Sequence, residues 1–240
     1  MGDGMSGWAA KRFWKQTEVA EVEGGFSVIL DGRAIKTPAK TPFVVPTRVM
    51  AEAIADEWDA QGDKIDPNTM PVTRTANSAI DKVATQFAEV ADMLAAYGDS
   101  DLLCYRATHP QELIDRQAAK WDPVLDWAAD ALEARLTPVS GVIHAPQDAA
   151  AIAHLTGRVH RFTPFELAAF HDLVGISGSL VLAFAVTEGH LEAEEAWNLS
   201  RLDEKWQEEQ WGEDEEATAQ ADIKRGEFLH ASRFFRHCAG

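Results

Sequence analysis

The chain has 240 residues, of which 46% are hydrophobic and 25% are charged, a balance typical of a soluble globular protein with one large domain or two small ones. Its formal net charge of −17 is opposite in sign to what binding to nucleic acid requires, so nucleic acid is not expected as a partner. The two cysteines, Cys104 and Cys238, are too few for a disulfide framework or a zinc cluster, and we expect no cofactor.

Two segments bear on the location of the protein. The first 15 residues, MGDGMSGWAAKRFWK, contain no apolar signal core and do not form a convincing transit peptide. The longest apolar run, Leu173–Val186, is shorter than the roughly 20 residues that a membrane-spanning helix needs. We therefore expect no membrane span and a bacterial cytoplasmic location, or the mitochondrial matrix if the source is a eukaryote.

The N-terminal part of the chain has the pattern of strands and tight turns. Apolar residues alternate over Phe26–Leu30, and Asp31-Gly32 then supplies the turn of a hairpin whose second strand covers Arg33–Lys36, because Asp-Gly between apolar runs favours a two-residue turn. A further short strand is predicted at Phe43–Val45.

A helix follows these strands. Thr47 is a suitable N-cap, Met50, Ile54 and Trp58 share one helix face, and Gly62 ends the helix. Residues 63–72, DKIDPNTMPV, contain two prolines and predict an extended linker. We therefore predict an α+β protein, with a strand-rich α/β domain over residues 1–72 and a helical domain over residues 73–240.

The rest of the chain is predicted to be mostly helical. One apolar stripe predicts a single helix from Ala76 to Tyr97, and Pro123 is expected to kink or split a later helix. The other expected elements are a helix opening at Thr108 and Pro110 and continuing to Leu132, a loop with one short strand over 137–146, and helices over about 147–160, 163–189, 191–211 and 214–236. The third of these helices starts with a capping box at Thr163–Glu166.

Small residues inside the helix expected over 163–189 suggest a close approach by a neighbouring helix at Gly175 and Gly178. The same glycines belong to the run GISGS, which cannot wrap a phosphate from inside a helix. Sequence signatures of serine hydrolases and zinc proteases are missing from the chain. The sequence therefore offers no familiar catalytic motif.

One arrangement keeps an enzymatic alternative open. His171-Asp172 is the kind of pair that binds a metal ion in helical phosphohydrolases, which complete the site with His and Asp ligands from other helices. His109, His154 and His160 are the residues that such a site would have to recruit, although no two histidines have the spacing for metal binding on one helix face. A metal-dependent phosphohydrolase is thus the alternative function.

The segment Leu199–Glu216, LSRLDEKWQEEQWGEDEE, combines an apolar stripe with a dense acidic surface. The like charges of such a surface repel one another, and a basic or hydrogen-bond-donating partner that docks on it would offset this repulsion. A solvated helix face without a partner is the simpler explanation. Trp206 and Trp211 favour the docking interpretation, because aromatic anchors beside charges are enriched at protein interfaces. We interpret Gly212 as the break that shapes a corner here, so the segment predicts a protein-binding surface.

Nearly the whole chain resembles the family of assembly chaperones for the alpha subunit of the F-type ATP synthase. The matching segments are FWK at Phe13–Lys15, LDGRAIKTP at Leu30–Pro38, VPT at Val45–Thr47, AIADEWDAQ at Ala53–Gln61, MPVT at Met70–Thr73, DLLCYRA at Asp101–Ala107, WDPVLDWA at Trp121–Ala128, GSLVLAFA at Gly178–Ala185 and LDEKWQEEQWG at Leu202–Gly212. Each segment is weak alone, but their order and spacing together are specific.

The resemblance implies a molecular chaperone, without catalysis, that binds the unassembled alpha subunit and prevents its aggregation until the beta subunit replaces it. It also places Glu215 where members of the family keep a glutamate three residues after the WG pair, although the run Asp214-Glu215-Glu216 is more acidic than in other members. A stable structural subunit of a larger complex is a third interpretation. The residues expected to bind the client, meaning the bound polypeptide, are Glu204, Glu208, Trp211, Gly212 and Glu215.

Other residues receive secondary assignments. Arg33 and Lys36, on the predicted hairpin, are further candidates for client contact. Asp101, Cys104, Tyr105 and Arg106 are expected to form a buried hydrogen-bonded joint between the two parts of the chain. The residues to which we assign structural roles are Trp58, Asp101, Tyr105, Arg106 and Trp121.

Overall fold

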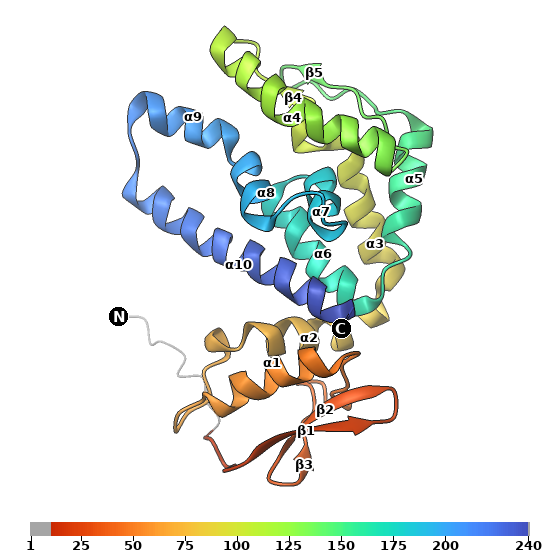
Figure 1. Cartoon of the computed structure of the whole chain (residues 1–240), viewed down its shortest axis with the longest axis vertical. Helices are drawn as coiled ribbons and strands as arrows, with labels where there is room; N and C mark the ends of the chain where they lie inside the picture. Colours follow the sequence, from red (N-terminus) through yellow and green to blue (C-terminus); the bar gives the residue numbers. More distant parts are fainter. Residues whose placement is uncertain (1–10, 240) are drawn as a thin grey trace, which may run out of the picture. The chain divides into compact units, whose positions relative to one another are not determined.

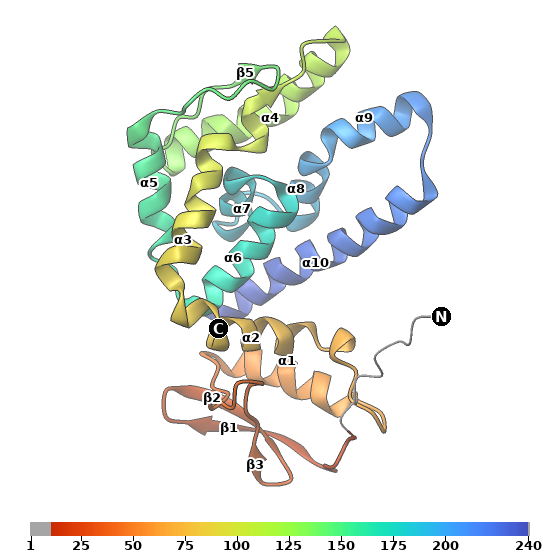
Figure 2. The ribbon, with the colours of Figure 1, turned by 180° about the vertical axis from the view of Figure 1, so that it is seen from behind.

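The computed structural model describes residues 11–239, which divide into two compact units (Figures 1 and 2). The first unit extends to Thr85 and includes the residues after Arg236, whereas the second spans Gln86–Arg236. A small antiparallel sheet belongs to the first unit and most helices belong to the second, so the predicted α+β class is confirmed. Most of the N-terminal segment that bears on location lies outside the described residues.

A three-stranded sheet is the centre of the first unit. Its strands, in spatial order, are β1 (Thr17–Val22), β2 (Gly25–Leu30) and β3 (Arg33–Ala34). The turn between β2 and β3 places Asp31 and Gly32 at φ 46° and 78°, the left-handed backbone that a two-residue hairpin of this kind requires. The predicted hairpin is therefore confirmed, although its second strand is shorter than expected.

The strand β1 does not follow from the local sequence, because the glutamates and alanine of TEVAEV favour helices. The strand forms because β2 pairs with it along its whole length. The strand expected at Phe43–Val45 is instead an isolated bridge, in which the N–H of Phe26 donates to Val45 O over 2.9 Å. Beside this bridge a Cβ on Gly25 would lie 2.2 Å from Val45 O, so only glycine permits the approach.

The helix α1 (Arg48–Asp59) covers the sheet and starts as predicted, because Thr47 accepts a hydrogen bond from the Met50 N–H. Its end is at Asp59 rather than Gly62. The helix α2 (Pro71–Asp81) follows after one 3-10 turn, so residues 63–72 are not simply an extended linker. Glu57 of α1 accepts hydrogen bonds from the first turn of α2, which makes α2 part of the first unit. The units therefore divide after Thr85, whereas a boundary at residue 72 was expected.

The second unit is helical except for one pair of short parallel strands. Its elements are α3 (Phe87–Ala95), β4 (Tyr105–Arg106), α4 (Gln111–Ala131), β5 (Val139–Ser140), α5 (Ala149–Val159), α6 (Pro164–Ser177), α7 (Leu180–Thr187), α8 (Ala193–Ser200), α9 (Leu202–Trp211) and α10 (Glu215–Ala239), whose last residues belong to the first unit. Within residues 11–239 no helix is long and apolar enough to cross a bilayer.

The core of the second unit forms around α6 and α7. Every side chain from Leu180 to Ala185 is at most 1% exposed, because α7 is apolar on all sides and packs against α4, α6 and α8 (Figure 1). The capping box predicted at the start of α6 is confirmed, since Thr163 accepts from the Glu166 N–H and the Glu166 carboxylate accepts from the Thr163 N–H.

Three helices expected to be continuous are divided. The stripe from Ala76 to Tyr97 breaks between α2 and α3 at a 3-10 turn over Val83–Thr85. The helix expected over 163–189 ends at Gly178, whose left-handed φ of 71° stops α6 before Ser179 caps α7. Arg201 separates α8 from α9. These breaks shorten the apolar helices, so their faces can turn independently toward the core.

Two other expectations concern helix interiors. Pro123 does not split its helix, because α4 continues through it from Gln111 to Ala131, and a kink at Pro123 stays a prediction. Gly175 is not a point of close helix approach, since a Cβ built there meets no atom within 4 Å. At Gly178 the glycine serves the left-handed end of α6 rather than a neighbouring helix.

Candidate functional site

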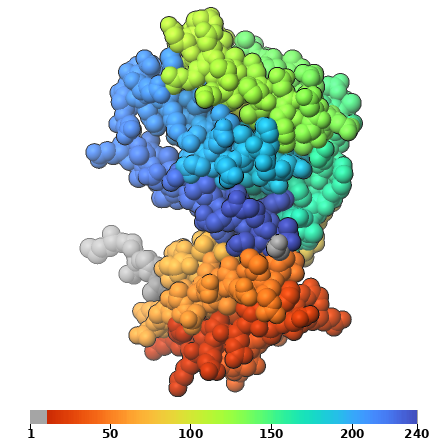
Figure 3. Space-filling model, viewed as in Figure 1, coloured from red at the N-terminus to blue at the C-terminus, as the bar shows by residue number. Residues whose placement is uncertain are grey.

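The acidic segment forms a sharp corner between α9 and α10, at the edge of the second unit (Figure 3). Gly212 stops α9 at φ 91° and ψ 163°, a backbone region that is essentially restricted to glycine. Two residues later, Asp214 Oδ1 accepts a hydrogen bond of 2.8 Å from the Ala217 N–H and thereby caps α10. The break predicted at Gly212 is thus present, and the sequence folds this corner through local signals alone.

The carboxylates that were predicted to bind a client differ in their surroundings. Arg201 Nη1 lies 2.8 Å from Glu204 Oε1, and its Nη2 lies 3.9 Å from Glu208 Oε1. Glu215 is exposed in the first turn of α10, where the helix dipole favours a negative charge. Two of the three glutamates are therefore partly neutralised within the chain, whereas Glu215 faces solvent.

The two tryptophans of the segment have different roles. Arg116 of α4 lies 4.6 Å above the ring of Trp206 and also forms an ion pair of 2.8 Å with Glu209, so Trp206 belongs to the contact between α4 and α9. Trp211 is 79% exposed at the last residue of α9. An indole that remains exposed beside carboxylates is the kind of anchor that protein interfaces use. Of the two, Trp211 is the candidate contact.

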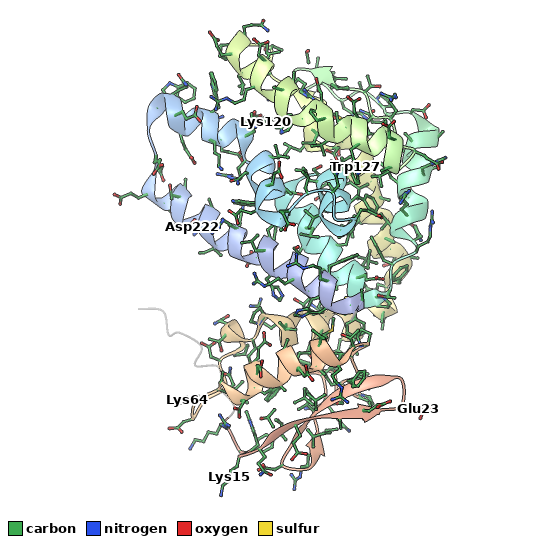
Figure 4. All side chains as sticks on the ribbon, viewed as in Figure 1. Lys15, Glu23, Lys64, Lys120, Trp127 and Asp222 are labelled. Atoms are coloured by element: carbon green, nitrogen blue, oxygen red, sulfur yellow. The ribbon has the colours of Figure 1, made fainter. Side chains whose placement is uncertain are left out.

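A groove of about 260 Å³ opens beside the corner, between α8, α9 and α10. Asp222 lies on the α10 side of this groove (Figure 4). The residues that line it are Trp197, Asn198, Arg201, Lys205, Glu208, Glu213, Thr218, Ala221, Asp222 and Arg225. Among the residues predicted to bind a client, only Glu208 faces this groove, so sequence reasoning missed most of it.

The other candidates for client contact, Arg33 and Lys36, belong to the first unit. Arg33 is exposed in β3, and Lys36 is exposed where an isolated bridge joins it to Pro42. Both side chains are accessible. The five corner residues belong to the second unit, so the structure does not group Arg33 and Lys36 with them.

Asp101 is the most deeply buried charged residue that was assigned a structural role. Its carboxylate is 0% exposed and accepts hydrogen bonds from Ser179 Oγ and from the N–H groups of Leu103 and Val181, at 2.8 to 3.0 Å. Burial raises the pKa of Asp101 from 3.8 to about 6, although these hydrogen bonds act in the opposite direction. The carboxylate thereby holds the start of α7 against the 3-10 turn Leu102–Cys104.

The neighbours of Asp101 continue this network. Arg106 donates to Leu103 O over 2.9 Å and to Asp122 Oδ1 over 2.7 Å, and its guanidinium lies 5.4 Å from the centre of the Trp121 ring. The Tyr105 hydroxyl lies 3.2 Å from His144 Nδ1. These contacts all lie within the second unit, so the expected joint between the two parts of the chain is instead an internal network.

The two structural tryptophans are placed differently. Trp121 is 1% exposed and its Nε1–H donates to Leu199 O over 3.0 Å, which fits the structural role that we propose for it. Trp58 is only half-buried, and its ring contacts Trp14 edge to face with centroids 5.1 Å apart. Trp58 thus packs at the margin of the first core, while the other members of its stripe, Met50 and Ile54, are 0% exposed.

The geometry gives no support to the alternative phosphohydrolase site. His171 Nδ1 lies 3.0 Å from Asp172 Oδ1, and this hydrogen bond raises the pKa of His171. The histidines that such a site would recruit are elsewhere: His154 pairs with Glu133 and His160 with Asp92, while His109 contacts Thr108. In the part of the chain that the structure describes, no three His, Cys, Asp or Glu side chains are arranged to hold a metal ion.

Comparisons with known proteins identify the class to which this chain belongs. The family model described as ATP12 chaperone protein matches residues 11–129. The crystal structure of Atp12 from Paracoccus denitrificans is 48% identical, with a TM-score of 0.93 over 95% of this chain and 98% of that one. A structure described as Atu1473, a putative chaperone from Agrobacterium tumefaciens, is 45% identical, with a TM-score of 0.90 over 96% of this chain and 86% of that one.

A curated relative from a eukaryote gives the same result. The protein named "Protein atp12, mitochondrial" from Schizosaccharomyces pombe is 28% identical over 227 residues, which cover 86% of this chain and 75% of that protein. The class is therefore that of ATP synthase assembly chaperones, which are not enzymes. The chain belongs to the ATP12 chaperone family.

Proposed function

We propose that this chaperone binds the unassembled alpha subunit of the F-type ATP synthase and prevents its aggregation until the beta subunit replaces it. An isolated ring subunit exposes surface that the ring normally buries, and exposed patches of this kind aggregate. A chaperone must cover such a patch and still release it. Polar contacts around a few aromatic anchors suit that task, because charge complementarity gives fast and selective association without an extensive apolar interface.

The observation that carries the proposal is the exposure of Trp211 within the acidic corner. An exposed indole gains contact area when a partner covers it, and the carboxylates around it select a basic partner. The negative charge is also concentrated here, since residues 192–222 contain twelve acidic and only two basic side chains. We therefore assign client contact to Glu204, Glu208, Trp211, Gly212 and Glu215.

Co-purification with separately produced alpha and beta subunits tests the proposal. We expect the chaperone to retain the alpha subunit and not the beta subunit, and to release the alpha subunit when beta is added. Size measurement of the free chaperone and of the mixture separates this transient association from a permanent structural partnership. Equal retention of both subunits, or of neither, would contradict the proposal.

Charge-reversal variants test the assigned site. Glu215→Lys and Glu208→Lys should keep the far-ultraviolet circular dichroism of the parent but lose the alpha subunit, because each places a positive charge toward a basic partner. Glu23→Lys is the matched control, since Glu23 is an exposed glutamate in the turn between β1 and β2 of the first unit (Figure 4). Undiminished retention by both corner variants would remove the site from the proposal.

We infer that the chaperone works where the subunits of the synthase assemble, in the bacterial cytoplasm or in the mitochondrial matrix of a eukaryote. The similarity to proteins from Paracoccus denitrificans and Agrobacterium tumefaciens supports the first location. The weaker similarity to a protein named as mitochondrial is compatible with the second. Fractionation of the source cells, with the chaperone detected by antibody, distinguishes these compartments from a membrane-bound location.

A further inference from the structure

The groove between α9 and α10 has walls that do not pack against each other. On the α10 side, Thr218, Ala221, Asp222 and Arg225 recur at the spacing of one helix face. On the opposite side, Arg201, Lys205 and Glu208 recur in the same way from the N-cap of α9 into its second half. Trp197 and Asn198 of α8 complete the lining. The groove is thus a slot between two helix faces that is wide enough to admit side chains from another polypeptide.

The first half of α10 borders this slot and has little packing of its own. From Glu215 to Glu227 only Thr218 and Ala221 are half-buried, and full burial begins at Phe228. A helical segment of this length is marginal in water without tertiary contacts. It is held by the cap at its start and by the ion pair of 2.7 Å between Arg225 and Glu194. Its groove-facing side is only half-buried at Thr218 and Ala221, so a partner can bury it further.

The charges in the groove are unevenly satisfied. Arg201 and Arg225 form ion pairs with Glu204 and Glu194, carboxylates outside the groove lining, and Arg201 also lies 3.9 Å from the groove-lining Glu208. The Lys205 ammonium donates a hydrogen bond to the Asn198 side chain. By contrast, neither Glu213 nor Asp222 forms an ion pair within 4 Å among the described residues, although the charge of Asp222 acts on Arg225 at longer range.

The ion pairs that the groove residues already form determine which charge a bound side chain should carry. The lining contains three cations and three carboxylates. The cations already have partners within the chain, and the surrounding residues 192–222 are strongly acidic. A cationic side chain gains most in such a place, because the surrounding charges attract it and its long alkyl stem can lie against small apolar side chains. Ala221 and Thr218 provide such a surface.

We propose that this groove receives a basic segment of the client, with one arginine or lysine side chain entering between Glu213 and Asp222 while Trp211 covers the same segment outside the groove. The inference rests on the proposed binding of the alpha subunit and specifies how it occurs. The client segment then lies between the two helices as well as against the corner residues to which client contact was assigned above. Its binding also supplies the packing that the first half of α10 lacks.

Filling the groove without changing its charge tests the inference. Ala221→Trp places a large side chain inside the groove, whereas Ala219→Trp places the same side chain on an exposed position of the same helix. We expect Ala221→Trp to weaken binding of the isolated alpha subunit by about tenfold or more, the loss typical of an occupied hot spot. Ala219→Trp should change the affinity by less than about twofold, as exposed contacts do.

A photo-crosslinking residue at position 221, compared with one at position 219, identifies what enters the groove. We expect crosslinking to the alpha subunit from position 221 only, through a peptide that contains lysine or arginine. A crosslinked peptide without a basic residue, or equal crosslinking from both positions, would overturn the inference. So would normal affinity in Ala221→Trp, or equal losses in the two tryptophan variants.

The outcomes separate the inference from the function on which it rests. If the unaltered chaperone binds the alpha subunit and the groove variants bind it equally well, the groove is wrong and the proposed function stands. If the unaltered chaperone does not bind the alpha subunit, the proposed function fails. Circular dichroism of each variant establishes that the helices are intact. Asp222→Lys supplies a second groove variant, which reverses the charge at the position where the basic side chain is expected to enter and should also weaken binding.

Discussion

Replacement of Asp101 by asparagine should remove a specific part of the pH dependence of stability. Burial raises the pKa of this carboxyl from 3.8 to about 6 in the folded state, so between these values the folded protein binds more protons than the unfolded chain. Its contribution to the free energy of unfolding therefore grows as the pH falls through this range and disappears above about 6. For these two pKa values the gain between pH 7 and pH 5 is about 1.3 kcal/mol.

Urea unfolding at pH 7 and pH 5 measures this effect for the parent and for Asp101→Asn. The asparagine amide cannot titrate. Its NH2 group also faces the Val181 N–H donor without accepting a hydrogen bond, which lowers the free energy of unfolding by about 1–3 kcal/mol at both pH values. The other carboxyl groups contribute equally to both proteins, so the difference between the two pH responses isolates Asp101. We expect the parent to gain about 1.3 kcal/mol more than the variant on acidification. Equal pH responses would refute the assignment of a raised pKa.

A second variant keeps this test decisive if Asp101→Asn does not fold. Ser179→Ala removes the hydroxyl that donates to the carboxylate, which raises the pKa of Asp101 further, because a hydrogen bond to the charged form is lost. Its stability should therefore increase more steeply on acidification than that of the parent. Since Ser179 also caps α7, the variant should be less stable by about 1 kcal/mol at pH 7.

Three further results follow from contacts in the second unit. Thr163→Ala removes an N-cap and should lower the free energy of unfolding by about 1 kcal/mol in urea, with no change expected in binding of the alpha subunit. Trp121→Phe leaves the carbonyl of Leu199 without its indole donor and should cost about 1–3 kcal/mol, whereas a neutral result would mean that water replaces the donor. Burial raises the pKa of Cys104 to about 12, so its thiol should resist iodoacetamide at pH 8 in the folded protein and react only after unfolding, with half-buried Cys238 as the internal comparison.

Helix starts were predictable because their signals are local. Thr47 and Thr163 each accept a backbone hydrogen bond within the next three residues, and the residue types alone indicate this. The break after α6 also has local signals, a glycine at a left-handed position and a serine cap, but the continuous apolar run conceals them. Ser179 also donates a hydrogen bond to the buried Asp101, which lies 78 residues earlier, and such a contact cannot be predicted from spacing.

The acidic corner was predictable in part for the same reason. Gly212 and the exposed Trp211 follow from local residue types. The role of Trp206 does not, because Arg116, which covers its ring, belongs to a helix that is distant in sequence. The groove also requires two helices joined at an unpredicted angle, so Asp222 could not be assigned to it before the fold was known.

The first half of α10, which is thinly packed, affects how quickly the free chaperone is degraded. A stretch whose side chains mostly face solvent opens more readily than the core, and local opening exposes peptide bonds to proteases. We expect limited digestion of the free protein to cut first between Gly212 and Glu227, and an occupied groove to protect that stretch. Proteolysis would then degrade the free chaperone and leave the client-bound chaperone intact. The amount of chaperone would follow the amount of unassembled subunit.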